Sequence, residues 1–168
     1  MKYLLSQDAC QHLVEKHPPG PLRRLLDLSK RNLAGISALT VAELEAMVFQ
    51  NRSSRNQAAL LRFLAPLEVI GFSEGCAAFY GWLRGMAFQG RISLNLLECQ
   101  IAAQALYEGR SLITLQGDRY ASVPGLKIEN WRKRAVTGGI QQPDVGSMWR
   151  SLRSAGRRKT KPGSSVSP

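Results

Sequence analysis

The chain has 168 residues, of which 44% are hydrophobic, so it can bury the core of one globular domain. No apolar run approaches the roughly 18 residues of a membrane span, and the apolar stretch before Asp8 is too short for a signal peptide, which predicts a cytoplasmic protein with no membrane partner. The formal net charge of +11 favours binding to a polyanion such as nucleic acid. The three cysteines are widely spaced and show neither CxxC nor Cys/His metal spacing, which indicates reduced thiols.

Short apolar strands alternate with helices from the first residues onward. In chain order, a strand at 2–5 precedes helices at 9–16 and 21–30, and a strand at 33–39 precedes helices at 40–49 and 58–64. A strand at 67–72 then precedes helices at 73–89 and 94–107, and two short strands follow at 111–114 and 126–129. Thr40 and Glu43 match a capping box, with Thr40 as the N-cap. The alternation predicts an α/β fold, a three-layer α/β/α sandwich with a central parallel sheet of about four to five strands.

The composition changes after Trp131, which predicts a domain over residues 1–131 and a disordered tail over 132–168. The tail holds nine Lys or Arg residues and one acid, so it carries +8 of the +11 charges. Such a segment would bind phosphates electrostatically, although a solvated end without a specific role fits as well. The predicted RNA-binding residues of the tail are Arg150, Arg153, Arg157, Arg158, Lys159 and Lys161.

Acidic residues lie near the carboxyl ends of several predicted strands, and in a parallel sheet those ends meet at one edge. Asp8 follows the first strand, and Glu43 begins the helix after the second. Glu98 begins the helix before the fourth strand, and Asp118 follows that strand. Gathered carboxylates would bind Mg²⁺ or Mn²⁺, which can activate water beside a phosphodiester. Each residue also has a structural interpretation, since Asp8 and Glu43 suit helix caps, Asp118 suits a turn and Glu98 suits a solvated helix face.

Five stretches share their order and separation with one protein family. They are MKYLL at 1–5, ISALTVAEL at 36–44, YGWLR at 80–84, ECQIAAQA at 98–105 and VPGLKIENW at 123–131. Together they resemble PIN-domain proteins of the VapC toxin type over residues 1–131. The resemblance implies an α/β/α domain, Mg²⁺-dependent cleavage of RNA, dimerisation and inhibition by a cognate antitoxin.

The family's metal site uses acidic residues at four places, and this chain departs from three of them. Glu43 is retained, Glu98 stands where the family has Asp, and Gln116 stands where it has Asp or Asn. Ser6 replaces the Asp that ends the family's first strand, and a hydroxyl supplies no negative charge. Either Asp8 has taken over that role, because residues i and i+2 of a strand point the same way, or the site no longer cuts.

Two functions follow from this sequence. The leading hypothesis is a divalent-metal-dependent endoribonuclease, the toxin of a toxin–antitoxin pair and a homodimer, with Mg²⁺ or Mn²⁺ held by Glu43, Glu98 and Asp8. Asp118 would be a fourth catalytic residue, and hydroxyl and amide groups would line the site from Ser6, Ser37, Thr114 and Gln116. The alternative is a catalytically silent PIN-like protein that binds RNA or an antitoxin without cleavage.

Overall fold

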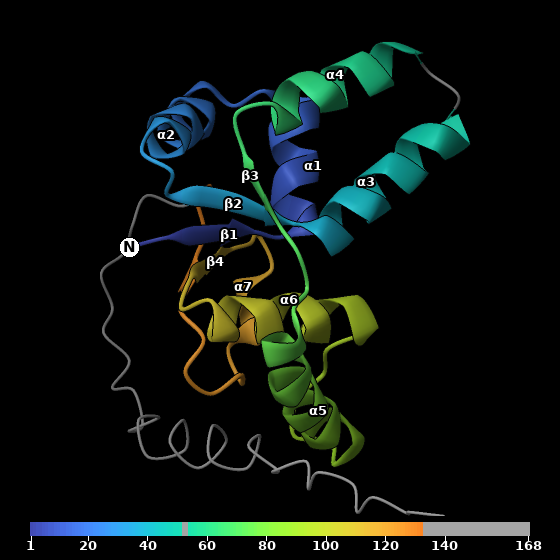
Figure 1. Cartoon of the computed structure of the whole chain (residues 1–168), viewed down its shortest axis with the longest axis vertical. Coiled ribbons are helices and arrows are strands. Elements are labelled where there is room, and N and C mark those ends of the chain that lie inside the picture. The colour runs from blue at the N-terminus through green and yellow to red at the C-terminus, as the bar shows by residue number, and fades with distance from the viewer. Residues whose placement is uncertain (52–53, 133–168) are drawn as a thin grey trace, which may run out of the picture.

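The computed structural model describes residues 1–51 and 54–132, which form a five-stranded sheet with helices on both faces (Figure 1). The strands are β1 (Tyr3–Leu5), β2 (Ala34–Ser37), β3 (Glu68–Ile70), β4 (Ser111–Ile113) and β5 (Ile128–Glu129). The helices are α1 (Gln7–Lys16), α2 (Pro19–Lys30), α3 (Ala38–Asn51), α4 (Ser54–Leu64), α5 (Glu74–Phe88), α6 (Leu96–Tyr107) and α7 (Gly117–Tyr120). All neighbouring strands pair in parallel, in the order β3-β2-β1-β4-β5, which confirms the predicted fold class.

Two hydrophobic cores lie on opposite faces of the sheet, because successive strand residues point to alternate faces. Leu4 and Leu112 belong to the core beneath α5 and α6, and Leu5 and Ile113 belong to the core beneath α1 to α4. Figure 1 shows these two groups of helices on either side of the sheet. With both faces covered, polar side chains that follow the strands collect at the carboxyl edge of the sheet.

Helix α1 begins closer to the first strand than the sequence predicts. β1 ends at Leu5 and α1 begins at Gln7, so the strand does not extend to Asp8. The predicted route by which Asp8 reaches the sheet edge, through strand periodicity, is therefore wrong. The short helix α7 was also missed, since its four residues read as a turn in the sequence.

Helix α3 begins directly after β2, which overturns the predicted cap at its start. The helix starts at Ala38, and the backbone N–H of Leu39 donates to the Ser37 hydroxyl at 3.2 Å. Thr40 therefore lies inside the first turn and is not the N-cap of the helix. Its buried hydroxyl has no hydrogen-bond partner among the residues that the structure describes.

The end of the described chain returns to the first strand. The ring of Trp131 meets that of Tyr3 edge to face, with centroids 6.1 Å apart. The Arg24 guanidinium lies 4.7 Å from the Trp131 ring centroid and pairs with Glu129 at 2.7 Å. These contacts join the last strand and Trp131 to the N-terminal part of the sheet.

The three cysteines are buried and unpaired, as predicted, at positions 10, 76 and 99. Within the described ranges, no helix combines the length and apolar character needed to cross a membrane. The tail residues predicted to bind RNA, Arg150 to Lys161, lie outside the described residues.

Candidate active site

Asp8 joins the ends of the neighbouring strands β1 and β4. Its carboxylate accepts hydrogen bonds from the Ser6 hydroxyl, from the Thr114 hydroxyl at 3.0 and 3.2 Å, and from the backbone N–H of Leu115 at 2.7 Å. Asp8 lies in the first turn of α1, where the positive end of the helix favours a negative charge. Local helix geometry therefore delivers the carboxylate to the sheet edge and holds it there.

Ser6 lies between β1 and α1, as the N-cap of α1, and its hydroxyl has two acceptors within reach. Its Oγ lies 2.7 Å from the carbonyl oxygen of Ile113 and also bonds to the Asp8 carboxylate. The Ser6 side chain is almost fully buried, so its polar contacts are made within the protein. Asp8, which is hydrogen-bonded to Ser6, thus supplies the negative charge that Ser6 lacks.

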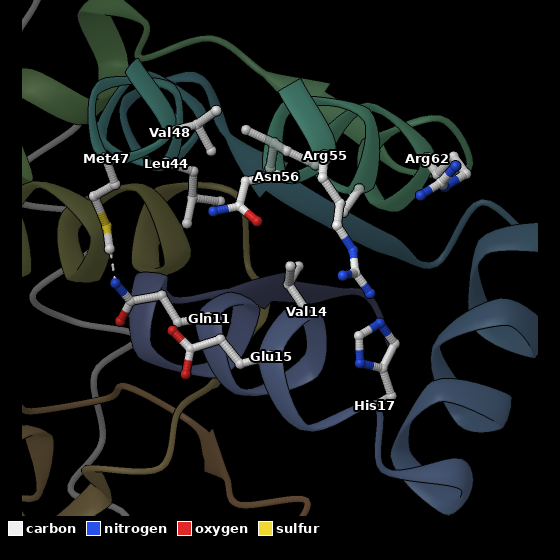
Figure 2. A pocket seen from close by; sticks show the side chains of 12 residues that line it. Gln11, Val14, Glu15, His17, Leu44, Met47, Val48, Arg55, Asn56 and Arg62 are labelled. Atoms are coloured by element: carbon white, nitrogen blue, oxygen red, sulfur yellow. Dashed lines mark hydrogen bonds between the residues drawn. The ribbon is translucent and has the colours of Figure 1, made fainter. Parts of the chain in front are cut away.

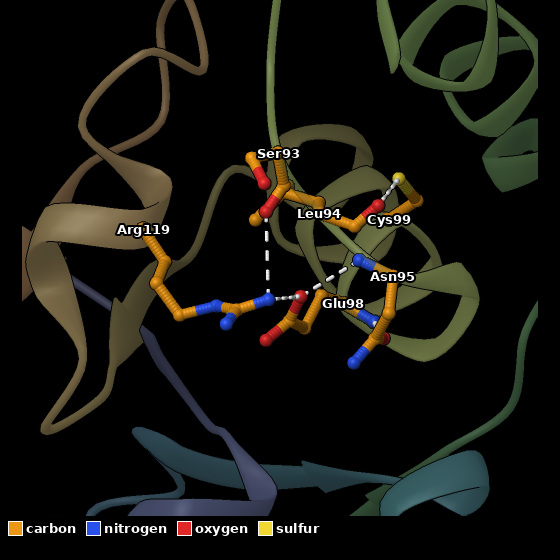
Figure 3. A network of polar contacts seen from close by, with 6 residues as sticks. All are labelled: Ser93, Leu94, Asn95, Glu98, Cys99 and Arg119. Atoms are coloured by element: carbon orange, nitrogen blue, oxygen red, sulfur yellow. Dashed lines mark hydrogen bonds and ion pairs between the residues drawn. The ribbon is translucent and has the colours of Figure 1, made fainter. Parts of the chain in front are cut away.

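Glu98 is held at the start of α6 by contacts on one oxygen. Its Oε2 accepts the backbone N–H of Asn95 at 2.7 Å, and the Asn95 side chain accepts the backbone N–H of Glu98 at 2.8 Å, so the two residues form a capping box. The same Oε2 accepts the guanidinium of Arg119 at 2.7 Å (Figure 3). The hydrogen bond and the charge of Glu98 raise the pKa of Arg119 above its usual value.

A polar cavity of about 340 Å³ brings part of the predicted site together. Burial, reinforced by the negative charges of Glu98 and Asp8, raises the pKa of Tyr120, so its phenol stays protonated at neutral pH. A protonated phenol on this cavity can donate a hydrogen bond. The lining residues are Ser6, Gln7, Asp8, Gln11, Asn95, Leu97, Glu98, Ile101, Gln116, Arg119 and Tyr120.

The other predicted site residues lie outside this lining. Glu43 is exposed on α3, and Asp118 is exposed on α7. Ser37 is buried and receives the Leu39 N–H described above. Thr114 is fully buried and acts on the cavity only through its hydrogen bonds to Asp8.

The donor set suits a cation that keeps much of its water. Across the described part of the chain, no three His, Cys, Asp or Glu side chains are grouped closely enough to hold a metal ion. Asp8 and Glu98 nevertheless line one cavity, together with the side-chain amide of Gln116. Mg²⁺ usually takes one or two carboxylates and several waters, so these residues fit a hydrated Mg²⁺ ion rather than a closed metal cage.

A second cavity, of about 500 Å³, is lined by residues of α1, α3 and α4 (Figure 2). Leu44 and Val48 give it an apolar wall, and the Gln11 amide donates to the Met47 sulfur at 2.9 Å at one end. Figure 2 shows His17, Arg55 and Arg62 toward the other end. Sequence reasoning missed this cavity, which is built from three helices, and also missed that Gln11 lines both cavities.

Comparison with known proteins places the chain in a family, although no family model matches it. It is 34% identical to Ribonuclease VapC2 from Rickettsia felis over 134 residues, which cover 79% of this chain and 100% of that protein. It is 24% identical to the tRNA(fMet)-specific endonuclease VapC of Salmonella typhimurium, over 78% of this chain and 98% of that protein. Among solved structures, VapBC2 from Rickettsia felis, bound to a DNA fragment from its promoter, contains a chain that matches with a TM-score of 0.71 over 78% of this chain and 99% of that one. The identity over a whole relative and the shared fold agree with the motifs noted above, and the chain belongs to the VapC family of PIN-domain toxins.

Proposed function

We propose that this VapC-family protein is an endoribonuclease that cleaves RNA phosphodiester bonds and is neutralised by a cognate antitoxin protein. The observation that carries the proposal is the pair of carboxylates, Asp8 and Glu98, on one polar cavity at the carboxyl edge of the sheet. The match to a relative named Ribonuclease VapC2 supports the reaction, and the match to a VapBC complex supports the protein partner. We further propose that the protein is a homodimer and acts in the cytoplasm, where such a substrate and partner are found.

We propose Mg²⁺ or Mn²⁺ as the cofactor, held by Asp8 and Glu98, with Glu43 as a third candidate ligand from α3. When bound, such an ion lowers the pKa of a water molecule and stabilises the leaving oxygen of a phosphodiester. The chain's own groups orient the carboxylates. The Thr114 hydroxyl and Leu115 N–H fix Asp8, and the N-terminus of α6 fixes Glu98. Tyr120 stays protonated and can donate a hydrogen bond to a phosphate oxygen in the cavity.

The relocation of one carboxylate supports an active site over a silent one. Ser6 removes a charge from the strand end, and Asp8 restores a charge beside it through their mutual hydrogen bond. The silent alternative has its own support, since Asp8 already accepts hydrogen bonds from three protein groups and Glu98 already pairs with Arg119. Activity then depends on whether water and a divalent ion can share these carboxylates with the donors of the protein.

Cleavage of a mixed RNA pool by the purified full-length protein tests the proposal. The assay compares Mg²⁺, Mn²⁺ and EDTA for the wild type and for Asp8→Asn, Glu98→Gln and Glu43→Gln. A matched control is Asp27→Asn, an exposed acid on α2 away from the cavity. We expect cutting that needs the metal, is lost in Asp8→Asn, Glu98→Gln and Glu43→Gln, and persists in Asp27→Asn. Cutting that persists in Glu43→Gln would remove Glu43 from the set of ligands. Folded wild-type protein that binds RNA but never cuts it with either metal would support the silent alternative instead.

A further inference from the structure

Arg119 brings a positive charge into an otherwise acidic cavity. Among the described residues that line this cavity, Arg119 is the one cation beside two carboxylates. Its Nη2 lies 2.7 Å from Glu98 Oε2 and 3.4 Å from the carbonyl oxygen of Ser93 (Figure 3). The guanidinium thus reaches from α7 to the start of α6, and both Arg119 and Glu98 line the candidate active site.

The Arg119 guanidinium can leave Glu98 at little cost. The Arg119 side chain is 45% exposed and the Glu98 side chain 16%, so water reaches the guanidinium directly and screens its side of the ion pair. Both recorded contacts use Nη2, so the guanidinium has further N–H donors for a second anion. A guanidinium binds phosphate oxygens through paired N–H groups, which a point charge cannot do as well.

The net charge of the cavity lining is unfavourable for a phosphate unless a cationic group such as Arg119 is present. Two carboxylates repel a phosphodiester, and the single positive charge of Arg119 leaves the lining with one uncompensated negative charge. A substrate phosphate that enters next to Asp8 and Glu98 therefore requires a cation to receive it. Arg119 is such a cation among the described residues. Its release from Glu98 would also free that carboxylate for a metal ion.

We propose that Arg119 binds the phosphate of the RNA substrate at this cavity and, in the RNA-free protein, occupies the Glu98 carboxylate in competition with a divalent metal ion. This role rests on the proposed ribonuclease function and names the residue that recognises the substrate phosphate. It has two consequences of opposite sign. Loss of the guanidinium should weaken RNA binding and strengthen metal binding. If Arg119 only held α6 and α7 together, its loss would weaken both kinds of binding or neither.

RNA binding over a salt series tests the first consequence. Full-length wild type, Arg119→Gln, Arg119→Lys and the control Arg23→Gln, an exposed arginine on α2, are titrated with a fluorescent single-stranded RNA in EDTA. We expect Arg119→Gln to bind about tenfold more weakly at low salt, with the slope of log K against log salt reduced by about 0.7. Arg119→Lys should keep most of the slope, and Arg23→Gln should stay within about twofold of wild type, because basic residues elsewhere contribute equally to all four proteins.

Mn²⁺ binding, followed by electron paramagnetic resonance without RNA, tests the second consequence. We expect Arg119→Gln to bind Mn²⁺ several-fold more tightly than wild type and Arg23→Gln to match wild type. An unchanged RNA slope, or Mn²⁺ affinity that is equal or weaker in Arg119→Gln, overturns the inference even if the wild type cleaves RNA. Wild-type protein that binds no RNA in EDTA overturns the inference, and it overturns the proposed function as well only if the protein also fails to cleave RNA with Mg²⁺ or Mn²⁺. Thermal unfolding of each variant checks that all four proteins remain folded.

Discussion

Replacing Asp8 with Ala should destabilise the protein as well as alter its site, because the carboxylate joins β1 to β4. Three protein donors meet it, namely the hydroxyls of Ser6 and Thr114 and the N–H of Leu115. The Ser6 hydroxyl can turn wholly to the Ile113 carbonyl at 2.7 Å, so it costs little to lose. The fully buried Thr114 hydroxyl and the Leu115 N–H have to find new acceptors.

The expected loss is about 2 to 3 kcal/mol of unfolding free energy. Each buried donor left without an acceptor costs roughly 1 to 3 kcal/mol, and water in the adjoining cavity offsets part of this. For a domain of this size the loss corresponds to a fall in unfolding midpoint of roughly 6 to 12 °C. Asp8→Asn keeps one acceptor oxygen and should lose about half as much.

Urea unfolding followed by tryptophan fluorescence measures these values for wild type, both Asp8 variants and Asp27→Ala. Asp27 is an exposed acid on α2, and its loss should change stability by less than about 0.5 kcal/mol. The reasoning fails if Asp8→Ala is no less stable than Asp27→Ala. That result would mean that the hydrogen bonds at the sheet edge contribute nothing and that Asp8 is free to serve a ligand alone.

Three further predictions concern the fold. Gly35→Ala should destabilise the protein by about 1 kcal/mol in urea, because a Cβ there would lie 2.6 Å from Ile70 Cδ1 and 2.9 Å from Arg110 Nη1, which have to move, and 3.2 Å from the backbone oxygen of Glu68. An unchanged midpoint would contradict the packing of β2. Burial raises the pKa of Cys10 and of Cys99, which keeps their thiols protonated at pH 8, so Ellman's reagent should label less than about one thiol in native protein and all three in guanidinium. We propose that the domain ends near residue 131. Truncation after Arg132 should then leave the thermal unfolding midpoint within about 2 °C of the full-length value. Truncation before Ile128 removes β5 and Trp131 and should lower the midpoint by more than about 5 °C.

The strands were predictable because central parallel strands are buried on both faces and appear as short apolar runs. Their ends were set too far along the chain, at Leu39 for example, because helices start at once after the strands. Capping-box patterns in the sequence could not locate the first residues of these helices. Thr40 with Glu43 and Asn95 with Glu98 both have the spacing of a capping box, and only the second pair forms one. Which pair caps a helix depends on where the preceding strand ends, and packing decides that.

The acidic pair of the site was predictable in part, and its cation was not. Asp8 and Glu98 followed from the expectation that acids near strand ends meet at one edge. Arg119 lies in a segment that reads as a turn, and it meets Glu98 across 21 residues of sequence through the contact of α7 with α6. No local pattern signals such a pair. The contacts of Gln104 were equally unpredictable from the sequence. Its fully buried amide donates to the carbonyls of Ile70 and Gly71 at 3.0 Å and joins α6 to the end of β3.

Two of the three departures from the family pattern, Ser6 with Asp8 beside it and Glu98, have a shared physical consequence. Asp8 and Glu98 both lie in the first turn of a helix, where the exposed N–H groups and the positive end of the helix favour negative charge. The extra methylene of Glu98, compared with Asp, lets its carboxylate reach back to the Asn95 N–H and complete the capping box. Hydrogen bonds from the protein therefore orient both carboxylates without a metal ion. A site built in this way depends less on the metal for its stability than one that packs four unpaired acids together, so removing the metal should alter activity far more than folding.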